Sequence, residues 1–99
     1  MKPVLFHARA AAEFDDAIAY YEGQRVGLGR ECRRELEAAL QRIRENPGSF
    51  PRDDDYDARF CIMNRFPFTF YFDEMPDSVW IAAVAHHARR PGYWAKRSP

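Results

Sequence analysis

Four phenylalanines at alternate positions constrain the fold of this chain more than any other feature. Phe66, Phe68, Phe70 and Phe72 alternate with residues of other kinds, which is the period of a β-strand with two different faces. Four aromatic rings on one face would form a large apolar patch in water, so a second layer of the molecule must cover them. The sequence therefore predicts a sheet with one covered face.

Two segments before this stripe have the spacing of amphipathic helices and can provide the cover. In the first, apolar residues recur at intervals of three and four over residues 11–21, and Gly23 and residues 27–29 interrupt the pattern. The second has the same spacing over residues 28–43 and stops at Asn46-Pro47-Gly48, because proline cannot continue a helix. These segments predict an α-helical hairpin.

Four strands complete the predicted α+β fold. The expected order is one N-terminal strand over residues 2–7, the helical hairpin, and then a three-stranded antiparallel meander over residues 59–63, 66–72 and 79–86. All four strands form one sheet, which the helices cover on one face. The opposite face, expected to carry Arg59, Thr69 and Tyr71, is predicted to stay more open.

Composition limits the chain to one globular domain over residues 1–99. Of the 99 residues, 46% are apolar and 30% are charged. Fifteen basic and 15 acidic side chains give a formal net charge of zero, which argues against a uniformly basic nucleic-acid binder. The charges are unevenly placed, because residues 79–99 hold four cationic side chains and no acidic one, while acidic residues gather over residues 53–57.

The distribution of apolar residues predicts a cytoplasmic protein without membrane contact. The longest uninterrupted apolar stretch, residues 79–85, is far shorter than the roughly 20 residues of a membrane-spanning helix. The N-terminal segment lacks the apolar region of a signal peptide. In the cytoplasm we expect Cys32 and Cys61 to be free thiols.

The stretch from His86 to Trp94 concentrates the side chains that are capable of chemistry. It holds two imidazoles, two guanidiniums and two aromatic rings within nine residues. The turn expected at Pro91-Gly92 folds Tyr93 and Trp94 back onto the sheet. In a purely structural interpretation, these two rings close the edge of the core and the arginines are solvated.

In a functional interpretation, cationic side chains converge beside the open face as a site for a phosphate or a carboxylate. The members of that site are Arg59, Arg65, His86, Arg89 and Arg90. A histidine there can move a proton while guanidiniums stabilise charge that develops on phosphorus. Metal binding by His86 and His87 is disfavoured, because adjacent strand residues point to opposite faces and no carboxylate or thiol is near in sequence. We expect neither a metal nor a cofactor.

Five short motifs, spread over nearly the whole chain, occur in the order of a known family. They are Tyr20-Tyr21-Glu22, Gly27-Leu28-Gly29, Ile43-Arg44-Glu45-Asn46-Pro47, Phe66-Pro67-Phe68 and His86-His87-Ala88-Arg89-Arg90-Pro91-Gly92-Tyr93-Trp94. Their joint order resembles the RelE/ParE toxin superfamily, and most closely its ParE-like, plasmid-stabilisation branch.

The resemblance implies the growth-inhibiting toxin of a type II toxin–antitoxin system, with a compact RelE/ParE-like fold. It also implies a cognate antitoxin, encoded next to the toxin, that neutralises it by direct binding in a hetero-oligomer. Direct DNA binding is expected only through the antitoxin. The partner-binding residues are expected to be Arg59, Thr69, Tyr71, His86, Arg89, Arg90, Tyr93 and Trp94.

The family divides on mechanism. RelE-like members cut mRNA on the ribosome, whereas ParE-like members act against DNA gyrase through protein contacts. The candidates for a nuclease site are Arg59, Arg65, His86, Arg89 and Tyr93. The lysines of RelE-like nucleases are missing, since Lys2 and Lys96 are the only lysines. The sequence therefore favours a gyrase inhibitor that is not an enzyme, and the alternatives are an endoribonuclease or a non-toxic binding module of the same fold.

Overall fold

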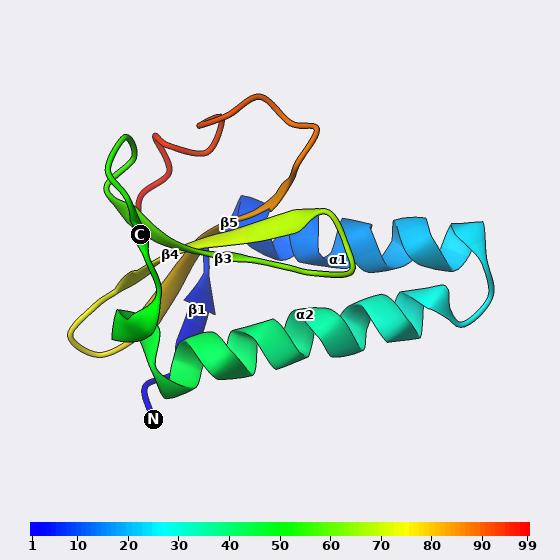
Figure 1. Cartoon of the computed structure of the whole chain (residues 1–99), viewed down its shortest axis with the longest axis horizontal. Coiled ribbons are helices and arrows are strands. Elements are labelled where there is room, and N and C mark those ends of the chain that lie inside the picture. The colour runs from blue at the N-terminus through cyan, green and yellow to red at the C-terminus, as the bar shows by residue number, and fades with distance from the viewer.

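A computed structural model describes residues 1–99 as two helices packed on one face of a five-stranded sheet (Figure 1). The elements, in chain order, are β1 (Val4–Phe6), α1 (Ala8–Gln24), α2 (Leu28–Glu45), a short 3₁₀ turn (Pro47–Ser49), β2 (Arg52–Asp53), β3 (Ala58–Ile62), β4 (Phe68–Glu74) and β5 (Val79–His86). The strands lie in the order β1-β5-β4-β3-β2. Only β1 and β5 are parallel, and the other pairs are antiparallel.

The α+β class, the helical hairpin and the antiparallel meander are confirmed, but the predicted strand count is wrong. The sheet has a fifth strand, β2, which lies at the start of the acidic stretch 53–57, where no strand was predicted. Its two residues pair with Arg59 and Ala58 of β3, and Asp57 turns the chain between them with φ +51°. Such a short edge strand is held by backbone hydrogen bonds and leaves no apolar period in the sequence.

The phenylalanine stripe is buried under the helices, as its period predicts. Phe70 and Phe72 are fully buried, and Phe66 and Phe68 are buried nearly as deeply. β4 begins two residues later than predicted, because Pro67 has no N–H to donate and Phe68 starts the pairing with β5. A register shift between Tyr71 and Phe72 marks a bulge in β4.

The helical hairpin turns at its glycines. Gly27 has a φ of +89°, and Gly29 lies so close to α1 that a Cβ on it would be 2.8 Å from the carbonyl oxygen of Ile18. The carboxylate of Glu22 accepts hydrogen bonds from the backbone N–H groups of both glycines and so satisfies donors at the start of α2. The buried face of α2 packs on the core through side chains at helical spacing, which are Cys32, Leu36, Ala39 and Ile43.

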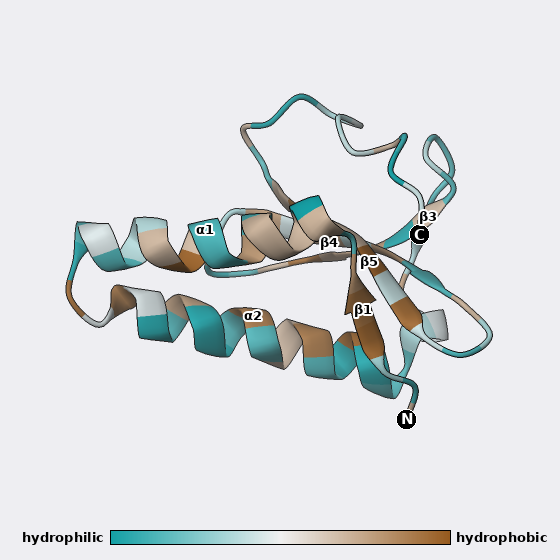
Figure 2. Ribbon diagram, turned by 180° about the vertical axis from the view of Figure 1, so that it is seen from behind, coloured by the Kyte–Doolittle hydropathy of each residue, from teal (hydrophilic) through white to brown (hydrophobic).

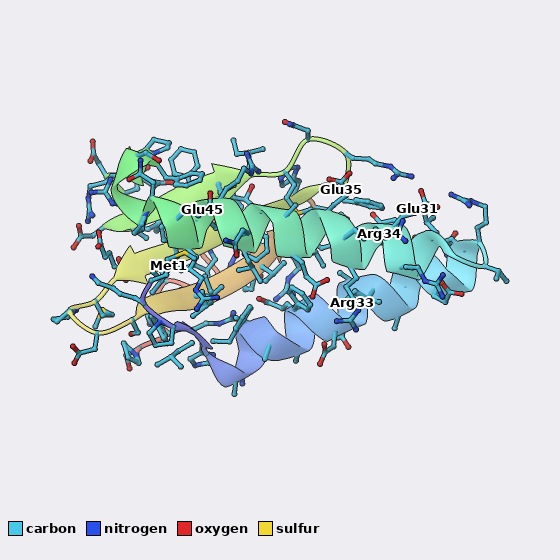
Figure 3. All side chains as sticks on the ribbon, turned by 90° about the horizontal axis from the view of Figure 1, so that it is seen from below. Met1, Glu31, Arg33, Arg34, Glu35 and Glu45 are labelled. Atoms are coloured by element: carbon cyan, nitrogen blue, oxygen red, sulfur yellow. The ribbon has the colours of Figure 1, made fainter.

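The outer surface of the hairpin is polar. Figure 3 views the molecule from the helix side and shows the labelled Arg34 and Glu35 on the exposed surface of α2. Cys32 and Cys61 are buried free thiols, as predicted. Neither helix is long and apolar enough to cross a membrane.

The sheet face opposite the helices is only partly open. The C-terminal segment crosses it, drawn in orange to red in Figure 1. A second buried cluster forms there from Ala58, Trp80, Ala82, Ala83, Ala85 and Trp94. The predicted return of the chain after Pro91-Gly92 is confirmed, since Trp94 is 4% exposed. The strip of this face next to the returning segment remains accessible.

Candidate functional site

The C-terminal segment and the sheet enclose a cleft with a volume of about 300 Å³, here called the C-terminal cleft. It is lined by Ile62, Thr69, Tyr71, Ala85, His86, His87, Arg89, Arg90, Pro91, Gly92, Tyr93 and Trp94. The loop leaves β5 after His86 and turns at Gly92, whose φ is +74°. A Cβ on Gly92 would collide with the ring of Tyr56, so only glycine lets the loop come this close to the sheet.

Aromatic rings form the floor of the C-terminal cleft. Tyr71 and Trp94 stack with their ring centroids 4.2 Å apart and an interplanar angle of 27°. The ring centroids of Tyr56 and Trp94 lie 5.3 Å apart, with an interplanar angle of 61°. Burial raises the pKa of the Tyr71 hydroxyl, and the negative charge of Asp53 adds to the effect. The floor therefore stays neutral and apolar.

Two histidines with fixed orientations stand at the mouth of the C-terminal cleft. The Nδ1 atom of His86 accepts a hydrogen bond from the backbone N–H of Ala88 at 2.9 Å, so neutral His86 carries its proton on Nε2. His87 Nε2 and Thr69 Oγ1 are hydrogen-bonded at 2.9 Å. His87 is the first residue after β5, so it belongs to the loop that lines the cleft. No group of three or more metal-ligating side chains occurs in the structure.

Arginines make the C-terminal cleft cationic. The guanidinium of Arg89 lies 3.9 Å from the ring centroid of Tyr93, in cation–π geometry. Neither Arg89 nor Arg90 forms an ion pair with any carboxylate of the chain. Both guanidiniums are exposed and free to bind an incoming anionic group.

A largely buried ion pair joins the cleft wall to α1. Arg97 forms a bidentate pair with Glu13, with both nitrogen–oxygen distances at 3.0 Å. Tyr93 donates its hydroxyl hydrogen to Glu13 Oε2 at 2.6 Å, and Glu13 Oε1 also accepts the backbone N–H of Val84. Burial, together with this hydrogen bond to a carboxylate, raises the pKa of Tyr93 far above its usual value.

A second hollow of about 230 Å³ continues the site onto α1. It shares His86 and Arg89 with the C-terminal cleft, and its α1 wall includes Asp16 and Tyr20. Tyr20 is 60% exposed. The two hollows form one recessed surface that runs from the aromatic floor, past the arginines, to an exposed tyrosine.

Seven of the eight side chains predicted to bind a partner line the C-terminal cleft. They are Thr69, Tyr71, His86, Arg89, Arg90, Tyr93 and Trp94. The exception is Arg59, and its predicted position on the open face is wrong. Arg59 pairs with Phe72 across the strands, so it shares the helix-covered face, where its Nη1 donates to the carbonyl of Phe50 at 2.7 Å.

Arg65 also lies away from the C-terminal cleft. It forms an ion pair with Glu31 on α2 at 2.6 Å, and its guanidinium lies 5.1 Å from the ring centroid of Phe66. Of the five cationic side chains expected to converge, the structure therefore brings together His86, Arg89 and Arg90 and separates Arg59 and Arg65.

Sequence reasoning missed Ile62 and Glu13. Ile62 is 57% exposed and pairs with Thr69 across the strands. Its face follows from strand alternation only when the register between β3 and β4 is also known. Glu13 lies on α1, outside the apolar stripe, and no local signal indicates that its carboxylate is largely buried and bonded to residues 80 or more positions later in the chain.

Comparison with known proteins shows a similarity of fold. No protein-family model and no curated protein sequence matches this chain. Among solved structures, the chain is similar to one described as "Chromosomal ParDE TA system from P. aeruginosa", where TA stands for toxin–antitoxin. The TM-score is 0.63 at 14% identity, over 87% of this chain and 96% of that one. The structural comparison thus confirms the predicted resemblance to a ParE-like fold.

Proposed function

We propose that this chain is the toxin of a type II toxin–antitoxin system and that a cognate antitoxin neutralises it by direct binding. The observation that carries the proposal is the fold similarity, at a TM-score of 0.63, to a chain of a ParDE toxin–antitoxin system. The five sequence motifs support it independently, because they follow the order of the same family.

The antitoxin binds across the C-terminal cleft and the adjoining hollow on α1. Tyr71 and Trp94 offer an apolar floor, and Arg89 and Arg90 offer unpaired positive charge. The complementary partner is a segment with apolar anchors and acidic side chains, since aromatic rings and arginines together are frequent interface anchors. Arg59 is not part of this interface, because its guanidinium is engaged with Phe50 on the other sheet face.

Induced expression tests the toxin assignment. Cells that express the chain alone should stop growing, and co-expression of the product of the adjacent reading frame should restore growth. The double variant Trp94→Ala with Tyr71→Ala removes the floor of the cleft and should lose toxicity. Circular dichroism first establishes that this variant still folds. If the folded natural chain leaves growth unchanged, the third alternative, a non-toxic binding module, replaces the toxin.

The target we propose is DNA gyrase, reached through protein contacts. The separation of Arg59 and Arg65 from the C-terminal cleft supports this mechanism, because a nuclease site needs its cations around one phosphate. Purified toxin should inhibit gyrase supercoiling in a concentration-dependent manner, and addition of the antitoxin should reverse the inhibition. Undiminished supercoiling at saturating toxin would contradict the gyrase mechanism and leave the antitoxin assignment intact.

A specific observation favours the ribosome-dependent endoribonuclease as the alternative. His86, His87 and Arg89 line a single cleft, and the hydrogen bond at Nδ1 of His86 leaves its Nε2 to face a substrate. Mapping of mRNA ends in expressing cells separates the mechanisms. If cleavage appears and His86→Ala abolishes it in a folded variant, the endoribonuclease replaces the gyrase inhibitor.

A further inference from the structure

The sheet has an unpaired edge at β1, and no residue of β1 lines the C-terminal cleft or the adjoining hollow on α1. β1 pairs only with β5, through hydrogen bonds that include Val79 N–H to the Pro3 carbonyl at 2.9 Å and His7 N–H to the Ile81 carbonyl at 3.0 Å. Residues of a parallel strand bond alternately to either side. The N–H and C=O groups of Val4 and Phe6 therefore point outward, and nothing in the chain pairs with them.

An exposed leucine lies at the centre of this edge. Leu5 is 53% exposed and pairs in register with Trp80, on the sheet face away from the helices. Figure 2 shows β1 in brown at the edge of the sheet, reaching from the end of α2 to the start of α1. Within β1 there is no charged residue and no proline, and Lys2 and Pro3 come directly before it. An apolar edge strand without a covering segment is a template for another strand.

On the helix side, an apolar groove runs along the same edge. Two hollows of about 240 and 250 Å³ share Phe6, Leu40 and Glu37, and Phe14 and Val4 extend the apolar lining at either end. A strand that pairs with β1 thus finds backbone partners at the edge, a leucine on one face and an apolar groove on the other.

The charges along this groove change sign from one end to the other. Arg44 lies at the Val4 end, held there by a 3.0 Å hydrogen bond from its Nε to the carbonyl of Lys2. Asp15 lies at the Phe14 end, and Glu37 lines both hollows between the two ends. None of these three side chains forms an ion pair within the chain.

We propose that a second copy of this chain binds at β1 in antiparallel orientation, with a two-fold axis at Leu5. This arrangement sets the outward-facing groups of Val4 opposite those of Phe6 in the second copy, as a hydrogen-bonded pair on each side of the axis. The two Leu5 side chains meet as a non-hydrogen-bonded pair, whose Cα atoms are about 4.5 Å apart. The two sheets become continuous.

Charge complementarity selects a second copy over an unrelated strand. Antiparallel pairing brings the Arg44 end of one groove against the Asp15 end of the other, and the two-fold axis repeats the match. The surface is self-complementary in its backbone groups, its central leucine and its charges. Because β1 has only three residues, the dimer is a weak one that forms at high concentration.

Sedimentation equilibrium tests the association and its position. The natural chain should rise from 11.6 kDa toward twice that mass as its concentration increases. Leu5→Lys and Leu5→Glu should each weaken dimerisation about tenfold or more, because like charges then oppose each other at the axis. Mixing the two variants should restore association. Circular dichroism melts of both variants show whether the monomer still folds.

Disulfide trapping tests the register. Leu5→Cys should form a covalent dimer under mild oxidation, because about 4.5 Å between Cα atoms is within the range of a disulfide. Val26→Cys, at a residue 88% exposed, is the control for random collision, and the native Cys32 and Cys61 are buried.

Three results would overturn the proposal. They are a constant mass of one chain, undiminished dimerisation of folded Leu5→Lys, and equal cross-linking of Leu5→Cys and Val26→Cys. Protection of the Val4 and Phe6 amides from hydrogen exchange only when antitoxin is added would instead identify a partner strand as the occupant, and would also contradict the dimer.

Discussion

The hydroxyl of Tyr93 donates a 2.6 Å hydrogen bond to Glu13, a residue 80 positions earlier in the chain. This contact joins the wall of the C-terminal cleft to α1. Arg97 completes the junction through its bidentate pair with the same carboxylate and a 2.9 Å hydrogen bond to the carbonyl of Ala82. The shape of the cleft therefore depends on a carboxylate outside it.

Glu13→Ala should destabilise the fold and loosen the cleft. The side chains of Glu13 and Arg97 are only 14% and 10% exposed, so removal of the carboxylate leaves a largely buried guanidinium unpaired. We expect the free energy of unfolding to fall by about 3 kcal/mol, measured by urea denaturation at neutral pH. Asp16→Ala, an exposed carboxylate on the same helix, is the matched control. Equal, small losses in both variants would show that the pair does not stabilise the fold.

Stability should fall at alkaline pH because of Tyr93. Its pKa is raised above the usual value of 10.0 in the folded state, so the folded chain holds this proton more tightly than the unfolded chain. The stabilisation is complete below pH 10 and is lost as the pH rises above it. Urea denaturation between pH 8 and pH 11 should show a steeper loss for the natural chain than for Tyr93→Phe. Identical slopes would contradict the assignment.

Trp94→Ala should remove the floor of the C-terminal cleft. The ring is 4% exposed and stacks on Tyr71, so truncation leaves a cavity and also breaks the aromatic contact. We expect a loss of about 3–5 kcal/mol in the free energy of unfolding, together with exposure of Tyr71 to a solvent quencher of fluorescence. Trp94→Phe should recover most of the stability. An Ala variant as stable as the natural chain would show that the C-terminal segment is not packed on the sheet.

Gly92→Ala should strain the turn that builds the cleft wall. Gly92 has a φ of +74°, and an added Cβ would meet the ring of Tyr56. We expect a destabilisation of about 1–3 kcal/mol by thermal or urea denaturation. Gly48→Ala is the control, because Gly48 has open space around it and no positive φ. Equal effects of the two substitutions would argue against a constrained turn.

The parts of the fold that repeat a period were predictable from the sequence. Phenylalanines at every second residue predict a strand with one buried face, and apolar residues at intervals of three and four before Asn46 predict helices with one buried face. Both patterns correspond to buried residues in the structure. Arg59 was placed on the wrong face because the face of an edge residue depends on its pairing with Phe72, which the sequence does not display. Glu13 was missed for the same reason, since its role comes from contacts made only after the chain folds.

Within the candidate site, the predictable residues were those that cluster in sequence. Seven of the predicted partner-binding side chains line one cleft, because five of them belong to the compact segment that ends at Trp94. Arg65 was not predictable, since its ion pair with Glu31 joins the turn before β4 to the first turn of α2, 34 residues earlier in the chain.

The affinity of the antitoxin for charge-reversed variants tests the central claim, that the C-terminal cleft binds the antitoxin. Isothermal titration calorimetry compares Arg89→Glu/Arg90→Glu with Arg33→Glu/Arg34→Glu, a pair of exposed arginines on the outer surface of α2 (Figure 3). We predict that the first pair of substitutions weakens binding about a hundredfold, while the affinity of the second variant stays close to that of the natural chain. Equal affinity of both variants, or a greater loss for the α2 pair, would contradict it.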